Sequence, residues 1–201
     1  MIYLASRSPR RRELLAQIGV KFELLLFREG PRQDPETDET VHPGEQPDDY
    51  VRRVALAKAE AAWQRILMRR GLRRMPVLAA DTTVALAGEI LGKPVDRADA
   101  ERMLRLLSGT RHRVLTAVAV GVEQRYDVAV SESLVTFGTL DEARIQAYAL
   151  CGEPHDKAGA YAVQGRAGAF VERIEGSYSG VMGLPLYETA NLLRLFGVTV
   201  P

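Results

Sequence analysis

The pattern of apolar and polar positions along the chain predicts a mixture of helices and strands. Apolar residues at helical spacing indicate amphipathic helices, and short apolar runs bounded by turn-forming residues indicate strands. In chain order the expected elements are a strand from residue 2, a helix at 9–18, a strand at 22–27, a loop at 28–47, a helix at 48–70, a strand at 76–86 with a short return at 90–91, a helix at 97–107, strands at 113–122 and 125–137, a helix starting near 139, strands at 161–164 and 169–174, and a helix at 185–196.

Residues suited to helix ends support several of these limits. Ser8 is a suitable N-cap and Pro9 a suitable first residue for the first helix. Asp96 is expected to cap the helix that follows it. The sequence from Thr139 to Glu142 has the form of a capping box, which makes Thr139 the expected N-cap of the next helix.

Taken together, these elements predict an α/β fold with one mixed, twisted sheet flanked by helices. The combination of helices and long strands is also compatible with two lobes around a central cleft. The chain contains no internal repeat, low-complexity segment or clear interdomain linker. We therefore expect residues 1–201 to form a single domain.

Composition excludes several classes of protein. The 201 residues include 27 Lys plus Arg and 26 Asp plus Glu, so the net charge of +1 argues against a broad surface for nucleic acid or an anionic membrane. A single cysteine, Cys151, excludes an internal disulfide framework and fits a reducing cytoplasm. No apolar run is long enough to span a membrane or to serve as a signal peptide, so we expect a cytoplasmic protein.

The start of the first helix has the features of an anion-binding site. A helix N-terminus exposes unpaired backbone N–H groups and the positive end of the helix dipole. Arg10 and Arg11 lie there, and a guanidinium donates two parallel hydrogen bonds to phosphate oxygens. The alternative is an ordinary solvated helix face. Because Leu14 and Leu15 dock the other side of the helix, we expect the arginines to face outward.

Asp81 interrupts an otherwise apolar strand pattern. An unpaired carboxylate is costly to bury, so Asp81 requires a basic residue, hydrogen-bond donors or a divalent cation as its partner. A strand aspartate alone is more often structural than catalytic. Two lysines make a catalytic role for Asp81 more plausible. Lys58 lies among small residues in a helix, and Lys93 lies on a tight turn between Gly and Pro.

A third chemical feature is the segment from Asp156 to Gly165, which combines a charged pair, several glycines and the amide side chain of Gln164. An amide offers both a donor and an acceptor, so this segment suggests ligand recognition, although glycines alone also mark turns. The histidines lack metal-ligand spacing. Carboxylates therefore remain the expected ligands, and they favour magnesium or manganese over zinc.

Several short motifs follow one another in order along nearly the whole chain. They are SRSPRR at 6–11, DET at 38–40, AKA at 57–59, ADT at 80–82, GKP at 92–94, LLSG at 106–109, DKAGAY at 156–161 and GLP at 183–185. This ordered set resembles the Maf family of nucleotide pyrophosphatases, also described as septum formation protein Maf-like.

The resemblance implies a fold related to the inosine triphosphate pyrophosphatases, with a cleft between two lobes, and a homodimer. It also implies hydrolysis of nucleoside triphosphates to the monophosphate and pyrophosphate with a divalent metal cation, Mg²⁺ or Mn²⁺. The form of the segment at 156–165 is similar to the subgroup that acts on dTTP and UTP, including modified pyrimidine triphosphates, in house-cleaning of the nucleotide pool.

The resemblance also assigns roles to individual residues. Asp81 is expected to be the catalytic acid or base, and Glu39 and Asp81 to hold the metal. Arg11, Thr82 and Gln164 are expected to contribute to substrate selection. The remaining residues expected to line the site are Ser6, Arg10, Lys58 and Lys93.

Two alternatives stay open at this point. The segment at 28–37 is longer than is typical before the DET motif, so Glu29 or Glu36 could take the place of Glu39 in the site. The family's link with septum formation also suggests a regulator that binds a nucleotide or nucleic acid without turnover.

Overall fold

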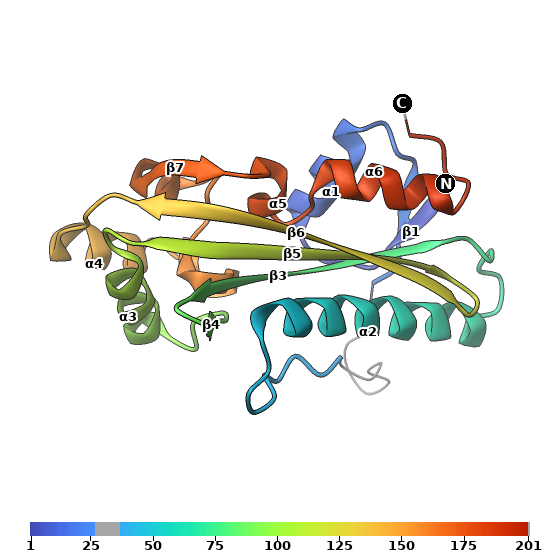
Figure 1. Ribbon diagram of the computed structural model, residues 1–201. Coiled ribbons are helices and arrows are strands. Elements are labelled where there is room, and N and C mark those ends of the chain that lie inside the picture. The colour runs from blue at the N-terminus through green and yellow to red at the C-terminus, as the bar shows by residue number, and fades with distance from the viewer. Residues whose placement is uncertain (27–36, 201) are drawn as a thin grey trace.

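The computed structural model describes residues 1–26 and 37–200, which form a seven-stranded mixed sheet and its surrounding helices (Figure 1). The strands are β1 (Ile2–Leu4), β2 (Phe22–Leu24), β3 (Val77–Leu86), β4 (Glu89–Leu91), β5 (Arg111–Val122), β6 (Arg125–Phe137) and β7 (Val171–Glu175). The helices are α1 (Pro9–Gln17), α2 (Pro47–Met68), α3 (Arg97–Leu107), α4 (Glu142–Leu150), α5 (Tyr178–Met182) and α6 (Leu186–Leu195), with short 3-10 helices η1 (Glu153–Asp156), η2 (Ala158–Ala160) and η3 (Arg166–Phe170).

The sheet has the strand order β2-β1-β3-β5-β6-β7, and β4 pairs with the far end of β3. β1 lies parallel to β2 and β3, whereas the pairs β3–β5, β5–β6 and β6–β7 are antiparallel. This arrangement confirms the predicted mixed α/β sheet and the predicted hairpin of β5 and β6.

Helices cover both faces of the sheet at the end that holds the chain termini (Figure 1). Successive strand residues point to opposite faces. Thus Val77 and Ala79 pack with α2 on one face, while Leu78 and Ala80 belong to the cluster that includes residues of α1 and α6 on the other. All four side chains are fully buried.

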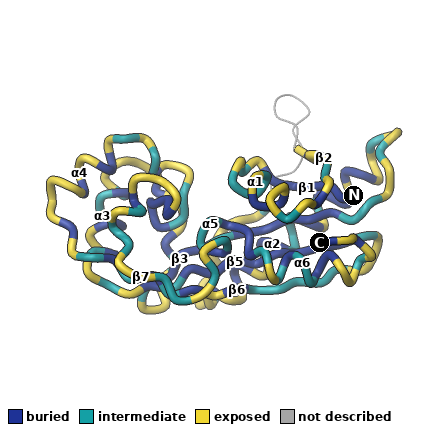
Figure 2. The backbone as a smooth tube through the Cα atoms, turned by 90° about the horizontal axis from the view of Figure 1, so that it is seen from above, coloured by how far each residue is buried: buried dark blue, intermediate teal, exposed yellow. Residues whose placement is uncertain are grey.

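A second lobe forms around the other ends of the long strands (Figure 2). There α3 and α4 pack on residues of β3, β5 and β6 in a separate cluster that includes Val84, Val114, Val135, Phe137 and Leu104. The strands β3, β5 and β6 run through both lobes (Figure 1). The sheet therefore connects the two lobes directly.

The middle of β3 has a strand on only one side. β1 pairs with Val77 and Leu78, and β4 pairs with residues 84–86. Between them, residues 79–83 pair with β5 alone among the strands that the structure describes. An unpaired strand edge leaves backbone groups and side chains accessible. This gap gives Asp81 and Thr82 access to the space between the lobes, although they point to opposite faces.

Two predictions about secondary structure are wrong. Residues 161–164 form no strand but a turn region before η3. The N-cap of α4 is Asp141, whose side chain accepts a hydrogen bond from the Arg144 N–H at 2.8 Å, so the cap lies two residues after the expected cap at Thr139. Within the part of the chain that the structure describes, no helix has the length and apolar content needed to cross a membrane.

Candidate active site

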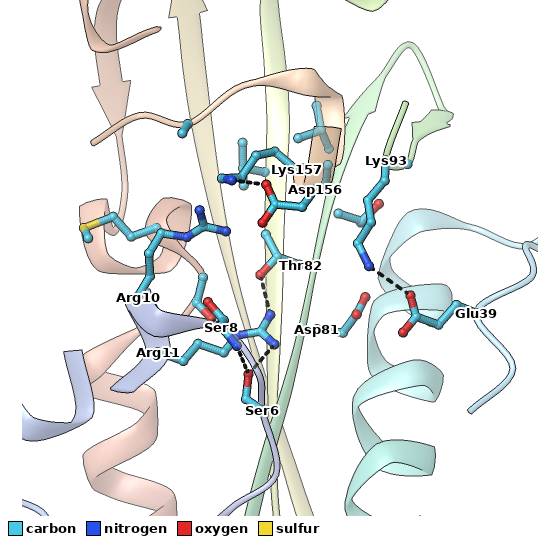
Figure 3. Close-up of a pocket in the computed structure, with 18 of the residues that line it drawn as sticks. Ser6, Ser8, Arg10, Arg11, Glu39, Asp81, Thr82, Lys93, Asp156 and Lys157 are labelled. Carbon is cyan, nitrogen blue, oxygen red and sulfur yellow. Dashed lines mark hydrogen bonds and ion pairs between the residues drawn. The ribbon is translucent and has the colours of Figure 1, made fainter. Parts of the chain in front are cut away.

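A cleft of about 1310 Å³ opens where the middle of β3 lacks a second neighbour (Figure 3). Its walls come from the start of α1, residues 37–41, α2, β3, the turn after β4 and the segment before η3. The structure places all nine residues predicted for the site in these walls: Ser6, Arg10, Arg11, Glu39, Lys58, Asp81, Thr82, Lys93 and Gln164.

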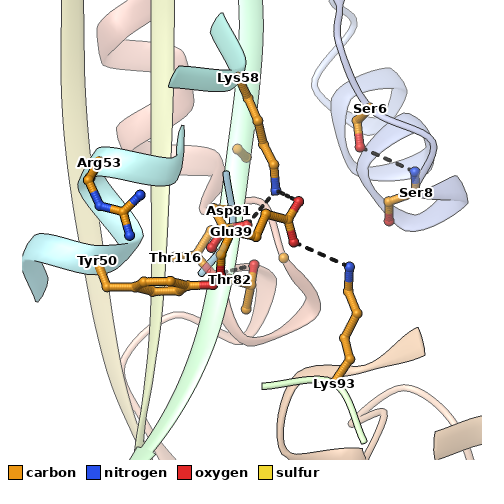
Figure 4. A network of polar contacts seen from close by, with 12 residues as sticks. Ser6, Ser8, Glu39, Tyr50, Arg53, Lys58, Asp81, Thr82, Lys93 and Thr116 are labelled. Atoms are coloured by element: carbon orange, nitrogen blue, oxygen red, sulfur yellow. Dashed lines mark hydrogen bonds and ion pairs between the residues drawn. The ribbon is translucent and has the colours of Figure 1, made fainter. Parts of the chain in front are cut away.

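The centre of the cleft is an ion-pair cluster around Lys58 (Figure 4). The Nζ atom of Lys58 lies 2.7 Å from Oδ1 of Asp81 and 2.7 Å from Oε1 of Glu39. Asp81 is only 7% exposed. Of the three kinds of partner that the sequence left open for this carboxylate, the fold supplies a basic residue. One ammonium thus joins carboxylates from β3 and from the loop before α2.

Within the described part of the long loop, Glu39 reaches this cluster; the alternatives Glu29 and Glu36 lie outside the described residues. Lys93 approaches its Oε2 atom at 3.6 Å. Burial by itself would raise the pKa of Glu39, but the charges of Lys58 and Lys93 outweigh burial and hold this pKa below its ordinary value. Glu39 is therefore ionised at neutral pH.

Tyr50 fixes the backbone of this loop, a contact that the sequence analysis missed. Its hydroxyl donates to the carbonyl oxygen of Glu39 at 3.0 Å. Burial, followed by the charges of Asp81 and Glu39, raises the pKa of Tyr50, so the hydroxyl keeps its proton. The sequence contained one signal for this contact. Tyr50 and Lys58 are separated by two successive i, i+4 spacings, which place both side chains on one face of α2.

Arg11 points into the protein rather than outward, contrary to the expectation from the sequence. Its Nε donates to the carbonyl oxygen of Gly183 at 2.8 Å, its Nη1 to that of Ala80 at 2.7 Å, and its Nη2 to the Thr82 hydroxyl at 3.2 Å. Burial lowers the pKa of the guanidinium, while Asp81 opposes this shift. Arg11 is thus a fixed positive charge in the wall of the cleft.

Thr82 belongs to the same buried network. Its hydroxyl lies 2.9 Å from that of Thr116 on β5, and Thr116 donates to the carbonyl oxygen of Gly180 at 2.8 Å. The network joins α1, β3, β5 and α5 behind one wall of the cleft. Sequence reasoning missed Thr116, because only the register that pairs Thr82 with Thr116 brings it to the site.

Positive side chains lie on both sides of the opening. Figure 3 shows Arg10 and Lys157 on one side and Lys93 on the other. Lys157 forms an ion pair with Asp156. Although burial would raise the pKa of Asp156, this pair and the charge of Arg10 keep it below its ordinary value. The arrangement suits a ligand with several negative charges.

The donor chemistry at the centre of the cleft fits a divalent cation only in part. Glu39 and Asp81 provide hard carboxylate oxygens, of the kind that magnesium prefers. Within residues 1–26 and 37–200, however, no group of three or more His, Cys, Asp or Glu residues is placed to hold a metal ion. Magnesium is often bound by one or two carboxylates together with substrate phosphates and water, which is the arrangement this pair allows.

The chain is similar in sequence to known proteins over nearly its whole length. The sequence profile of the family described as "Maf-like protein" matches residues 1–196. A protein from Aromatoleum aromaticum named dTTP/UTP pyrophosphatase is 59% identical over 197 residues, which cover 98% of this chain and 95% of that protein. A protein of the same name from Cupriavidus pinatubonensis is 60% identical over 193 residues, with coverage of 96% and 95%.

A solved structure shares the fold at much lower identity. The Staphylococcus aureus Ham1 protein superimposes with a TM-score of 0.50 and 18% identity, covering 97% of this chain and 96% of the Ham1 chain. At this level of identity the likeness concerns the fold alone. It shows that the open mixed sheet with flanking helices also occurs in a protein of very different sequence.

Proposed function

The chain belongs to the Maf-like protein family, and from this membership we propose that it hydrolyses dTTP and UTP to the nucleoside monophosphate and pyrophosphate. The observation that carries the proposal is the contact of Lys58 with both Asp81 and Glu39 inside a cleft with basic walls. The names of relatives that are about as long as this chain and 59% and 60% identical support the choice of dTTP and UTP.

In this proposal Asp81 is the catalytic base. A water molecule attacks the α-phosphorus, and Asp81 accepts the proton that this water loses. The bond between the α-phosphorus and the oxygen that bridges to the β-phosphate breaks, and pyrophosphate leaves. Lys58 holds one oxygen of Asp81, so the direction of the carboxylate is fixed before substrate enters.

The basic side chains would neutralise the triphosphate. Arg10, Lys93 and Lys157 line the opening, where the charged phosphates of a nucleotide would enter. Negative charge builds up on the leaving pyrophosphate as the bond breaks, and preorganised cations stabilise such charge strongly in a partly dry site. Arg11 is held by protein acceptors, so it would act as a fixed charge and as a support for Thr82.

Glu39 and Asp81 are the residues that would hold a divalent cation, Mg²⁺ or Mn²⁺. The cation supplies positive charge that neutralises the phosphate oxygens. The two carboxylates supply its protein ligands, and Lys93 balances the charge of Glu39 from the other side. Chelator in the assay would therefore remove activity, and added magnesium or manganese would restore it.

Gln164 would read the base, with Arg11 and Thr82 shaping the same selection. The amide of Gln164 can donate to one carbonyl oxygen of thymine or uracil and accept from the ring N–H. Gln164 lines the cleft. Replacement by alanine would therefore reduce activity on dTTP and UTP more than on purine nucleotides.

Release of pyrophosphate from dTTP, UTP, CTP, ATP, GTP and 7-methyl-GTP tests the proposal directly. We expect metal-dependent release from dTTP and UTP. Release from purine nucleotides alone would contradict the choice of substrate but leave the reaction in place. Binding without release from any nucleotide would favour the alternative of a nucleotide-binding regulator of cell division.

We also propose that the chain acts as a homodimer in the cytoplasm, where the nucleotide pool is found. Sedimentation velocity of the purified protein checks the oligomeric state. The single cysteine, Cys151, and the near-equal numbers of acidic and basic residues are consistent with a reducing compartment and with a small-molecule substrate rather than nucleic acid.

A further inference from the structure

The backbone that carries Gln164 belongs to no strand and no α-helix. Residues 161–165 run as an extended stretch and a turn between η2 and η3, closed by a hydrogen bond from the Gly165 N–H to the Ala162 carbonyl at 3.0 Å. Sheet pairing does not fix the place of the Gln164 side chain. Whatever holds this turn therefore sets where the amide lies in the cleft.

Tyr148, near the end of α4, holds the beginning of the turn. Its hydroxyl oxygen accepts a hydrogen bond from the Ala162 N–H at 3.2 Å, and the same hydroxyl donates to Oε1 of Glu153 at 2.9 Å. Tyr148 is 4% exposed, and its ring packs edge-on against Phe170. Burial and the hydrogen bond to Glu153 raise the pKa of Tyr148, so the hydroxyl keeps the proton that it donates.

Glu153, the first residue of η1, holds the end of the turn. Its Oε2 accepts from the Arg166 N–H at 3.2 Å. The carboxylate also lies directly against Gly165: a Cβ atom on that residue would be 2.1 Å from Oε1 and 2.5 Å from Cδ. A larger residue at position 165 would therefore displace the Glu153 carboxylate from its present position.

We propose that Tyr148 and Glu153 are positioning residues for base selection. Together they bind the main-chain N–H groups two residues before and two residues after Gln164, and they bind each other. They touch neither Asp81 nor Lys58 in any contact described above. The inference rests on the proposed function, since it assigns these residues to the selection of thymine and uracil rather than to hydrolysis itself.

The test compares Tyr148→Phe with the unchanged protein on dTTP, UTP and ATP. The phenylalanine ring keeps the packing, but the hydroxyl that links the turn to Glu153 is lost. We expect kcat/KM for dTTP and UTP to fall about tenfold, the loss that accompanies one buried hydrogen bond, mainly through KM. Turnover of ATP, which makes no matched contact with Gln164, stays within about twofold.

A double-mutant cycle separates positioning from a general loss of stability. If Tyr148 acts through Gln164, adding Tyr148→Phe to Gln164→Ala lowers kcat/KM for dTTP by less than about twofold further, because coupled residues are not additive. The inference would be overturned if Tyr148→Phe lowered kcat/KM for dTTP equally in the unchanged protein and in Gln164→Ala, or if it lowered kcat/KM equally for every nucleotide. Tyr187→Phe is the matched control, since Tyr187 is 77% exposed and outside the cleft walls.

Glu153→Gln provides a second test if Tyr148→Phe folds poorly. Glutamine has the same size, but its NH₂ group cannot accept the hydrogen bonds from both Tyr148 and the Arg166 N–H as the carboxylate does. We expect the same selective loss on pyrimidine nucleotides, and unchanged selectivity would contradict the inference. If the unchanged protein releases pyrophosphate from purines but not from dTTP or UTP, the proposed substrate fails before any variant is compared.

Discussion

At the scale of single residues, the centre of the site is one ammonium group that pairs with two carboxylates. Lys58 contacts two carboxylates at once, and the buried one, Asp81, has it as a close ionic partner. In a cleft that excludes part of the solvent, such a contact holds both carboxylates in one direction. Lys93 approaches Glu39 from the opening, and Arg10 also lines the cleft, so further positive charge surrounds this cluster.

Replacement of Asp81 by asparagine tests its proposed role. Asparagine is nearly the same size and still offers an oxygen to Lys58, but it cannot accept a proton from water. We expect turnover of dTTP to fall by about 10²–10⁴-fold, the usual contribution of a positioned general base, while nucleotide binding stays measurable by calorimetry. Asp127→Asn, on β6 outside the cleft walls, is the matched control. Unchanged turnover in Asp81→Asn would remove this residue from the mechanism.

His112 is a buried titratable group on β5. It is 1% exposed, its Nε2 lies 2.9 Å from the Tyr161 hydroxyl, and its Nδ1 has no hydrogen-bond partner among the described residues. Burial lowers the pKa of His112 from 6.5 to about 4. Between pH 6.5 and about 4, His112 takes up a proton in the unfolded chain but stays neutral in the folded protein. The contribution of neutral, buried His112 to the free energy of unfolding is therefore complete above pH 6.5 and is lost as the pH falls toward 4.

We therefore predict that the free energy of unfolding falls by about 2 kcal/mol between pH 7 and pH 5 on account of His112 alone. His112→Gln, which keeps a hydrogen-bonding side chain but does not titrate, should show a correspondingly smaller fall in urea titrations at the two pH values. An identical pH dependence in His112→Gln would contradict the prediction.

At the scale of elements, local sequence signals predicted most helices and strands but not every boundary. The cap of α3 at Asp96 is confirmed, with its side chain accepting from the Asp99 N–H. The cap of α4 is wrong by two residues, because Thr139 and Asp141 are both acceptable caps and sequence alone does not rank them. The expected strand at 161–164 failed for a different reason: the Ala162 N–H donates to the Tyr148 hydroxyl of α4 instead of pairing with a neighbouring strand.

The site shows the same division between local and long-range information. The resemblance carried by the ordered motifs predicted that Asp81, Lys58 and Gln164 belong to one site, and all three side chains line the cleft. The orientation of Arg11 could not be predicted, because its acceptors lie in β3 and near the end of α5, far along the chain from α1. Its neighbours in sequence indicate an exposed helix start, whereas the acceptors that bury it exist only after folding.

The cap of α4 yields a prediction about stability. Asp141 accepts a hydrogen bond from the Arg144 N–H, so Asp141→Ala should lower the free energy of unfolding by about 1 kcal/mol. Asp141→Asn keeps the capping oxygen and should cost much less. Thr139→Ala, at the cap expected from the sequence, should change stability by less than about 0.5 kcal/mol. Chemical denaturation of the three variants checks this, and a larger loss in Thr139→Ala than in Asp141→Ala would contradict the assignment.

At the scale of the whole molecule, the cleft lies between two lobes that share their strands. On β5, Val114 packs in the cluster of the α3–α4 lobe, and Val118 and Val120 pack in the cluster beside α1 and α6. Separation of the lobes would require the hydrogen bonds of one continuous strand to break in its middle. The cleft is therefore supported by a continuous sheet rather than by a hinge between independent domains.

We predict from this that residues 1–201 unfold as one cooperative unit. Two natural probes report on the two lobes: Trp63, a residue of α2 that is 3% exposed, by fluorescence, and Cys151, the C-cap residue of α4, by thiol labelling. Their urea midpoints should coincide, because neither lobe keeps its core without the shared strands. Two separate transitions would show that the lobes fold independently. A nucleotide that binds in the cleft, whose walls come from both lobes, should raise both midpoints together, and at about 100 times its Kd it should add about 2.7 kcal/mol to the free energy of unfolding.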